Sequence, residues 1–137
     1  MTPNFLRRLL PLFLFSAAAV SAADVAKITP KEAAARVAAN TAVLVDVREP
    51  AEWAETGVAA SAVLLPKSDF DGAQKLWAEF LARNSGKEVI LYCRSGKRAG
   101  ILGAALAAKG LKVANAGGFA DWAAAGLPTR KVEAAKP

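Results

Sequence analysis

Apolar residues in this chain form short continuous runs that are separated by longer amphipathic stretches. The clearest runs are "AVLVDV" at 42–47, "AVLL" at 62–65 and "EVILYC" at 88–93. Their apolar residues stand side by side rather than at alternating positions, which is typical of strands buried on both faces. The three runs therefore predict buried strands in a sheet that is covered on both sides.

The stretches between these runs carry helical periodicity or helix-start signals. A short strand leads into a helix that begins with a capping box of Thr29 and Glu32, has Pro30 in its first turn and ends at Asn40. A short helix at 50–56 is expected to end at Gly57. The remaining expected elements are a helix at 72–83 with Leu76, Trp77, Phe80 and Leu81 at helical spacing, an alanine-rich helix at 98–110, a strand at 112–115, and a turn with a short helix within 117–129.

Strands that alternate with helices predict a parallel sheet with helices on both faces. We expect one α/β domain over residues 24–130, because 137 residues suffice for one domain and hardly for two. Residues 131–137 are expected to form a flexible tail. In such a fold, ligands bind outside the carboxyl ends of the strands. The end of the strand at 88–93 is therefore a candidate site.

The first 23 residues have the pattern of a secretory signal peptide. A basic pair at 7–8 is followed by an apolar stretch at 9–20, and "SAA" precedes Asp24. The apolar stretch is shorter than the roughly 20 residues of a membrane span. We expect cleavage after Ala22 or Ala23, which gives a periplasmic or secreted protein without a stable membrane anchor. A retained N-terminal anchor is the alternative.

The charge of the chain is basic but dispersed. Its 18 lysine and arginine residues stand against 12 acidic residues, a net charge of +6, and removal of Arg7 and Arg8 with the leader lowers this charge to +4. Proteins that bind nucleic acid typically have clustered cations with aromatic residues between them, and this sequence has no such cluster. We therefore expect no nucleic-acid partner, whereas small anionic substrates are compatible with the charge.

The chain has one cysteine, Cys93, and no histidine. A single cysteine forms no internal disulfide, so Cys93 is either a buried spectator or a free reactive thiol. The usual zinc sites need several cysteine or histidine ligands. No metal is therefore expected, and no sequence feature indicates a cofactor.

The candidate site consists of six consecutive residues that end one strand and begin the next helix: Cys93, Arg94, Ser95, Gly96, Lys97 and Arg98. A thiol attacks as the thiolate, and here no histidine base is present to form it. The three cations can favour the thiolate instead, and the tight turn can direct its amides at the sulfur. Such a cradle would also bind an anionic substrate. The alternative is a structural cysteine followed by a solvated basic loop.

Three segments resemble, in their order and spacing, the single-domain rhodanese-like sulfurtransferases: "LVDVREPAEW", "YCRSGKRA" and "NAGGFADWAAAGLP". The resemblance runs from Ile28 to Pro128. It implies a rhodanese-like fold and an enzyme of the thiosulfate sulfurtransferase type. In this family the cysteine, here Cys93, takes the outer sulfur of thiosulfate or a similar sulfane donor as a persulfide. The sulfur then passes to a thiophilic acceptor, which can be cyanide, a thiol or a protein thiol.

The resemblance also suggests roles for residues outside the loop. Asp46 and Arg48 of "DVRE" are similar to a strand-end pair of the family, which we expect to be structural, with shaping of the site as the alternative. Three residues are similar to its turn and packing elements: Gly117, Gly118 and Trp122. Trp53 is expected in the core.

One segment departs from the family pattern. Where the family usually has Gly-His-Ile, this chain has "GVA" at 57–59. The missing histidine is generally structural in the family, so its loss puts the packing of this loop and the rim of the pocket in question.

Two further functions remain open at this point. Rhodanese-like phosphatases and arsenate reductases have a longer loop, Cys-x5-Arg, because a tetrahedral oxyanion needs a wider cradle. The spacing from Cys93 to Arg98 is Cys-x4-Arg, which favours sulfur. The other function is a non-enzymatic exported persulfide carrier or redox-sensing partner protein, which would need the same cysteine and cations.

Overall fold

The computed structural model describes residues 25–134. Its centre is a five-stranded sheet in the order β1-β6-β5-β2-β4, and every neighbouring pair of strands is parallel. The strands of this sheet are β1 (Ala26–Lys27), β2 (Ala42–Asp46), β4 (Val63–Leu64), β5 (Glu88–Cys93) and β6 (Val113–Gly118). The predicted α/β fold with a central parallel sheet is thus confirmed.

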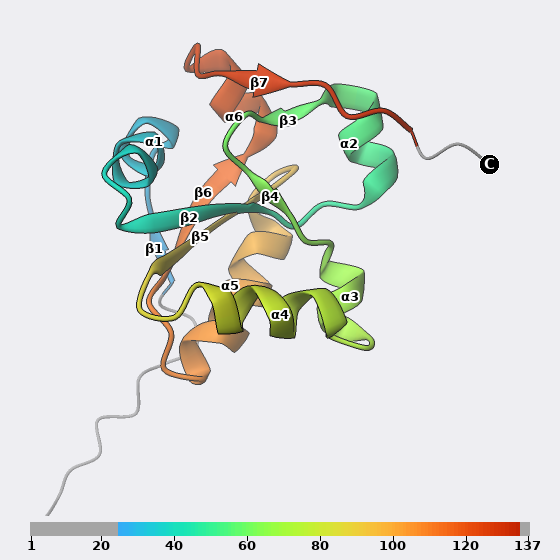
Figure 1. Ribbon diagram of the computed structural model, residues 1–137. Helices are drawn as coiled ribbons and strands as arrows, with labels where there is room; N and C mark the ends of the chain where they lie inside the picture. Colours follow the sequence, from blue (N-terminus) through green and yellow to red (C-terminus); the bar gives the residue numbers. More distant parts are fainter. Residues whose placement is uncertain (1–24, 135–137) are drawn as a thin grey trace, which may run out of the picture.

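Helices cover both faces of the sheet, as Figure 1 shows. One face packs against α1 (Pro30–Ala38) and α6 (Phe119–Ala124), and the other against α3 (Lys67–Asp71), α4 (Lys75–Arg83) and α5 (Lys97–Ala108). The short helix α2 (Pro50–Thr56) follows β2 at the carboxyl edge of the sheet. The predicted capping box of α1 is present, because Thr29 and Glu32 exchange backbone-to-side-chain hydrogen bonds of 3.2 and 2.8 Å.

Alternate side chains of the central strands enter two separate cores, as expected for extended backbone. In β5, Ile90 and Tyr92 join the core under α1 and α6. Leu91 and Cys93 join the core under α4 and α5, where Trp77 is almost fully buried. All six residues of β5 are buried. The strand that carries the cysteine therefore lies at the centre of the molecule, and its side chain at 93 points towards the α5 face.

Two sequence predictions need correction. The run at 62–65 is not a buried strand, because β4 has only two residues and lies at the edge of the sheet, where Val63 is 38% exposed. The helix expected at 72–83 begins later, at Lys75, and is preceded by the separate helix α3. The Asp69 carboxylate causes this break: it accepts hydrogen bonds from the first amides of α4, those of Leu76 and Trp77, at 3.1 and 3.0 Å.

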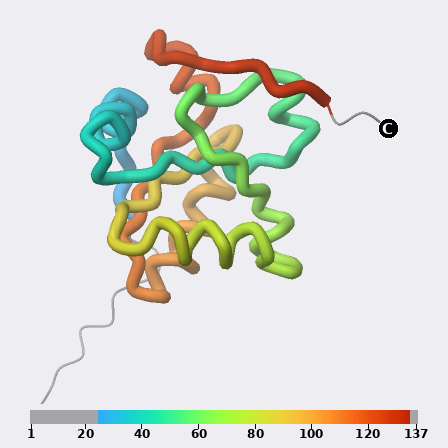
Figure 2. Tube along the Cα trace, viewed as in Figure 1, coloured from blue at the N-terminus to red at the C-terminus, as the bar shows by residue number. Residues whose placement is uncertain are grey.

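The departure at 57–59 is accommodated by a second, antiparallel sheet of β3 (Val58–Ala59) and β7 (Thr129–Arg130). Figure 2 shows the C-terminal segment returning beside this earlier part of the chain. Gly57 has a φ of +79°, and a Cβ there would come within 2.7 Å of the Arg130 carbonyl oxygen. Val58 and Ala59 are fully buried. The segment without the family histidine is therefore packed into the protein by apolar residues.

The predicted leader lies outside the described residues, as does the end of the predicted tail. Residues 131–134 form no helix or strand. Within 25–134, no helix has the length and hydropathy needed to cross a membrane.

Candidate functional site

The candidate site lies where three parallel strands end at the same edge of the sheet. The register pairs Asp46 at the end of β2 with Tyr92 of β5, and Cys93 with Gly118 at the end of β6. A register shift between Leu91 and Cys93 interrupts the ladder just before the cysteine. The fold thus brings the "DVRE", cysteine and "GGF" segments together at one edge, where ligands of parallel α/β sheets bind.

The loop after Cys93 turns back over the sulfur. The Gly96 amide donates a hydrogen bond to Sγ at 3.0 Å. This turn requires glycine, because Gly96 has a φ of +92°, a left-handed conformation that other residues adopt at a cost. α5 begins at Lys97, so its first amides have no acceptor within the helix and lie at the same turn. Cys93 itself is fully buried. The turn therefore directs one N–H donor, the Gly96 amide, at the buried sulfur.

A close approach of two backbones fixes the base of this loop. A Cβ on Gly118 would lie 2.3 Å from the Arg94 carbonyl oxygen, far inside van der Waals contact. Gly117 has a φ of +82°. Packing against the cysteine loop explains Gly118, and the left-handed turn explains Gly117, which agrees with the structural role expected for both.

Asn115 of β6 holds the loop from the other side. Its Nδ2 donates to the Gly96 carbonyl at 2.9 Å, and its Oδ1 accepts from the Gly117 amide at 2.9 Å. The Asn115 side chain is buried, and its two bonds connect the cysteine loop to the turn after β6. Sequence reasoning missed this residue, although a polar side chain within an otherwise apolar strand was a visible signal.

Asp46 and Arg48 form a buried ion pair behind the site. The guanidinium of Arg48 donates from Nε and Nη2 to both Asp46 oxygens, with contacts of 2.8 to 3.2 Å. It also donates to the Thr56 hydroxyl at 2.8 Å and to the Gly57 carbonyl at 2.9 Å. Burial lowers the pKa of Arg48, but the bonds and charge of Asp46 outweigh it and raise that pKa overall. This pair therefore joins the end of β2 to the C-terminal end of α2.

The same guanidinium stacks on aromatic rings. It lies 4.7 Å from the ring centre of Phe119 and 5.8 Å from that of Tyr92. The Tyr92 hydroxyl accepts a hydrogen bond from the Ala59 amide at 3.0 Å. Burial, and then the charge of Asp46, raise the pKa of Tyr92, so its hydroxyl stays neutral. Phe119 and Tyr92, which the sequence did not single out, thus link α6, β5 and β3 beneath the site.

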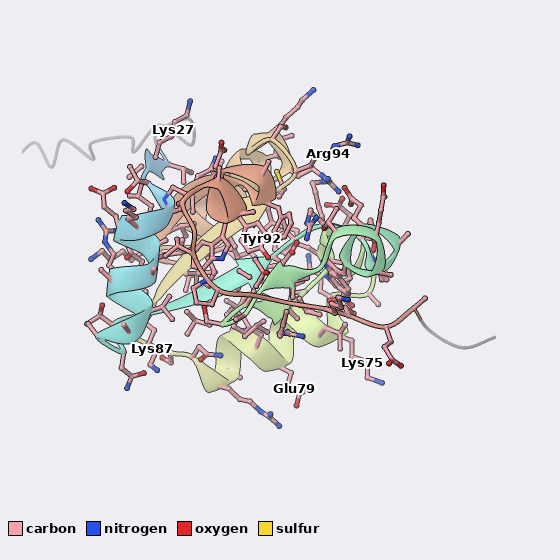
Figure 3. The ribbon with its side chains drawn as sticks, turned by 90° about the horizontal axis from the view of Figure 1, so that it is seen from above. Lys27, Lys75, Glu79, Lys87, Tyr92 and Arg94 are labelled. Atoms are coloured by element: carbon pink, nitrogen blue, oxygen red, sulfur yellow. The ribbon has the colours of Figure 1, made fainter. Side chains whose placement is uncertain are left out.

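The basic residues of the loop differ in their partners. Arg98 forms a bidentate ion pair with Glu52 of α2, with both N···O distances at 2.7 Å. Arg94 and Lys97 are exposed, and neither forms an ion pair within residues 25–134. Figure 3 shows Arg94 extending outward from the edge of the molecule, while Tyr92 lies at its centre. Glu52 was not predicted as part of the site.

Two cavities flank the cysteine loop. A cavity of about 160 Å³ lies between α2 and α6, and its walls include Arg48, Glu52, Glu55, Thr56, Arg94 and Phe119. A larger cavity of about 620 Å³ lies on the β1 side, and its walls include Lys27, Ser95, Gly96, Lys97, Asn115 and Gly117. Every predicted loop residue between Arg94 and Lys97 therefore borders a space that a small molecule can enter. Between residues 25 and 134, no three potential metal ligands cluster together.

A match to one family model covers the three segments that meet at this site. The family model described as Rhodanese-like domain matches residues 29–125, which is most of the chain. This chain belongs to the rhodanese-like domain family. No curated protein matches it closely enough to count as a relative.

Solved structures show the same rhodanese-like fold. A protein of unknown function from Rhodopseudomonas palustris, described as a possible tyrosine phosphatase, is 26% identical with a TM-score of 0.66, covering 77% of this chain and 85% of its own. The polysulfide-sulfur transferase homodimer of Wolinella succinogenes is also 26% identical, with a TM-score of 0.64 and 82% of each chain covered. A human single-domain sulfurtransferase is 23% identical with a TM-score of 0.57, covering 74% of this chain and 97% of its own.

Proposed function

We propose that this protein is an exported sulfurtransferase that moves a sulfane sulfur through a persulfide on Cys93. The donor is thiosulfate or a similar sulfane compound, and the acceptor is cyanide, a small thiol or a protein thiol. The observation that carries the proposal is the buried Cys93 sulfur bound by the Gly96 amide at 3.0 Å within a Cys-x4-Arg loop. Membership of the rhodanese-like family and the similarity to a solved sulfur transferase support sulfur transfer at the family level.

The first half-reaction loads the cysteine. The Cys93 thiolate attacks the outer sulfur of thiosulfate, a new S–S bond forms, and the donor S–S bond breaks with its electron pair leaving on sulfite. The outer sulfur of the resulting persulfide can accept hydrogen bonds from amides at the start of α5, which do not have helical partners. Arg94 and Lys97, which are exposed at the loop, can attract the dianionic donor and stabilise the departing sulfite.

The second half-reaction unloads the cysteine. A nucleophilic acceptor attacks the outer persulfide sulfur, and the Cys93 thiolate leaves with the electron pair of the broken S–S bond. Cyanide gives thiocyanate in this step, and a thiolate gives a new persulfide. The thiolate present at the start is regenerated, so the cycle needs no outside oxidant, reductant, metal or cofactor.

Loop length supports sulfur transfer over ester hydrolysis. The similar Rhodopseudomonas palustris protein is described as a possible tyrosine phosphatase. In this chain α5 begins at Lys97, immediately after the left-handed Gly96, so the loop is short and directs the Gly96 amide at a single sulfur atom. A tetrahedral phosphate or arsenate group would need amides around several oxygens, which the longer Cys-x5-Arg loop provides.

A comparison of two turnovers on one preparation tests this proposal. We expect thiosulfate-to-cyanide sulfur transfer to exceed aryl-phosphate hydrolysis by several orders of magnitude, and Cys93→Ser to abolish the transfer. Faster hydrolysis of the phosphate ester would contradict the proposal and support a phosphatase. Stoichiometric persulfide without turnover, across cyanide and thiol acceptors, would instead indicate a persulfide carrier.

Export to the periplasm or beyond the cell is the second part of the proposal. It is supported by the basic pair, the short apolar stretch and the small residues "SAA" before Asp24. An exported protein enters an oxidising compartment, but a chain with a single cysteine cannot form an internal disulfide there. Its thiol would therefore stay available for sulfur chemistry there.

A further inference from the structure

The ion pair between Arg98 and Glu52 connects the cysteine loop to α2. Both terminal nitrogens of Arg98 are directed at the two oxygens of Glu52, at 2.7 Å each, and both side chains are partly buried, with 30% and 25% of their surface exposed. The bonds from Arg98 hold the pKa of Glu52 down to about 2, so this carboxylate remains charged in any ordinary assay. The positive charge of Arg98 is therefore committed to a carboxylate on a neighbouring helix.

The helix that carries Glu52 has little freedom to move. Glu52 itself accepts from the Glu49 amide at 2.9 Å in the first turn of α2. Glu49 in turn accepts from the amide and hydroxyl of Ser68 at 3.1 and 2.7 Å. At its other end, Arg48 binds Thr56 and Gly57. The carboxylate of Glu52 is thus held in place from both ends of the helix, so it can fix the position of Arg98.

Arg98 also interacts electrostatically with the Cys93 thiolate. Hydrogen bonds to Glu52 raise the pKa of Arg98 most, and the negative charge of the Cys93 thiolate contributes in the same direction. Glu52 and Arg94 line the same cavity of about 160 Å³ beside the loop. A change in the partner of Arg98 would therefore change the electrostatic field that an incoming substrate meets at the sulfur.

We propose that Glu52 is a positioning residue that holds Arg98 by its bidentate ion pair and so sets how strongly the cysteine loop attracts anionic sulfur donors. The inference deepens the proposed sulfur-transfer function and rests on it. With Glu52 in place, attraction of the donor depends on Arg94 and Lys97, the two exposed cations of the loop. Without it, Arg98 becomes a third uncompensated cation near the sulfur, which increases the rate with dianionic donors more than with neutral reagents.

The effect of nearby charges on a reagent that approaches the Cys93 sulfur can be measured without enzymatic turnover. Cys93 is the only thiol of the chain, so alkylation reports on it alone. Anionic iodoacetate and neutral iodoacetamide react with the same thiolate, and the ratio of their rates is therefore independent of the thiolate fraction. One unit charge acting through water over 4–7 Å changes such a ratio by about three- to fivefold.

We expect Glu52→Gln to raise the iodoacetate-to-iodoacetamide ratio about threefold and to lower the KM for thiosulfate by a similar factor. Arg98→Gln should lower the ratio, because it leaves the charge of Glu52 uncompensated. The double variant should return to within twofold of the wild type. This reciprocal pattern is specific to a charge pair, whereas a purely structural pair would lower the rates of both reagents together or change neither.

Two further variants separate the position of the Glu52 carboxylate from its charge, and two measurements check that the variants fold. Glu55→Gln removes one negative charge from the same helix and the same cavity, but Glu55 is exposed and forms no ion pair within 25–134. Water screens its charge, so the ratio should change less than twofold. Glu52→Asp keeps the charge but is too short to hold Arg98 in the same bidentate pair. Its ratio should rise, but by less than in Glu52→Gln, because the carboxylate still compensates part of the charge of Arg98. Circular dichroism and Tm of each variant establish that the fold is retained.

The outcomes distinguish this inference from the proposed function. An equal ratio in Glu52→Gln and Glu55→Gln, or an unchanged ratio in Glu52→Asp, would overturn the positioning role even if the wild type transfers sulfur. A wild type that is alkylated but gains no sulfur from thiosulfate or polysulfide would overturn the proposed function instead, while the ratios would still decide whether Glu52 positions Arg98. Failure of both reagents to alkylate the folded wild type would contradict a reactive Cys93, and both proposals with it.

Discussion

Cys93 and Gly118 are register partners at the ends of adjacent parallel strands, and the Arg94 carbonyl oxygen lies against the Cα of that glycine. A Cβ at position 118 would lie only 2.3 Å from this oxygen. The end of β6 therefore determines how closely the cysteine loop can follow its strand.

Gly118→Ala should displace the cysteine loop. We expect a loss of about 1–3 kcal/mol in the free energy of unfolding, because the added methyl group overpacks a backbone contact, together with a large loss of sulfur transfer. Urea unfolding and thiosulfate turnover measure the two effects. Gly100→Ala is the matched control, since its Cβ would meet only the Asn115 amide at 3.5 Å within a regular helix. Equal activity of the two variants would show that the contact at Gly118 does not position the loop.

Asn115→Ala should weaken sulfur transfer through the loop it braces. Removing this side chain leaves the Gly117 amide without its partner and removes one of the two hydrogen bonds that the Gly96 carbonyl accepts, at a cost of about 1–3 kcal/mol. We expect kcat to fall more than tenfold. Asn84→Ala, which removes a bond of 2.8 Å to the Phe80 carbonyl far from the site, is the control. A comparable loss of kcat in both variants would point to general destabilisation rather than loop positioning.

The Glu52–Arg98 pair should make stability depend on acid pH. The pKa of Glu52 is lowered from 4.5 to about 2 in the folded chain, so the folded state binds fewer protons than the unfolded state between these values. Its contribution, on the order of 2 kcal/mol, is full above about pH 5 and is lost as the pH falls through 2. Unfolding of the wild type and of Glu52→Gln at pH 6 and pH 3 should show the smaller decrease in Glu52→Gln.

A matched carboxylate on the surface separates this pair from acid sensitivity in general. Glu79 pairs with Arg83, but both side chains are mostly exposed, so Glu79→Gln should keep the pH dependence of the wild type. The linkage argument would be wrong if both glutamine variants flattened the dependence equally.

Several parts of this molecule could be predicted from sequence because local physics decides them. The continuous apolar runs at 42–47 and 88–93 form interior strands. Helices cover both faces of the parallel sheet, so the side chains on both faces of these strands are buried and the apolar pattern is continuous rather than alternating. Thr29 and Glu32 formed the expected capping box because both partners lie within one turn. The position of Cys93 at a strand end followed from the same reasoning.

Other features depend on contacts between segments far apart in the chain. The run at 62–65 has the composition of an interior strand, but only the order of the strands places it at an edge. The start of α4 is set by Asp69, which lies outside the helix it caps. The partner of Arg98 is separated from it by 46 residues, so no local pattern pointed to Glu52. The three cations therefore looked equivalent in the sequence, although one of them is paired.

Export should leave a mature chain that begins at Ala23 or Asp24. The apolar stretch after the basic pair is long enough for a signal peptide and short for a membrane span. N-terminal sequencing of protein isolated from its native cells, together with fractionation, tests this prediction. A native chain that begins at Met1 or Thr2 would contradict it.

The intact mass of the protein after exposure to thiosulfate tests the central claim most directly. The wild type should gain one sulfur atom, localised to Cys93 by peptide mapping, and should return to its original mass when cyanide is added. Cys93→Ser should keep its mass throughout, because a hydroxyl at this position cannot form a persulfide. A wild-type mass that stays unchanged with thiosulfate and with polysulfide, while the fold is intact, would contradict a sulfurtransferase that works through Cys93.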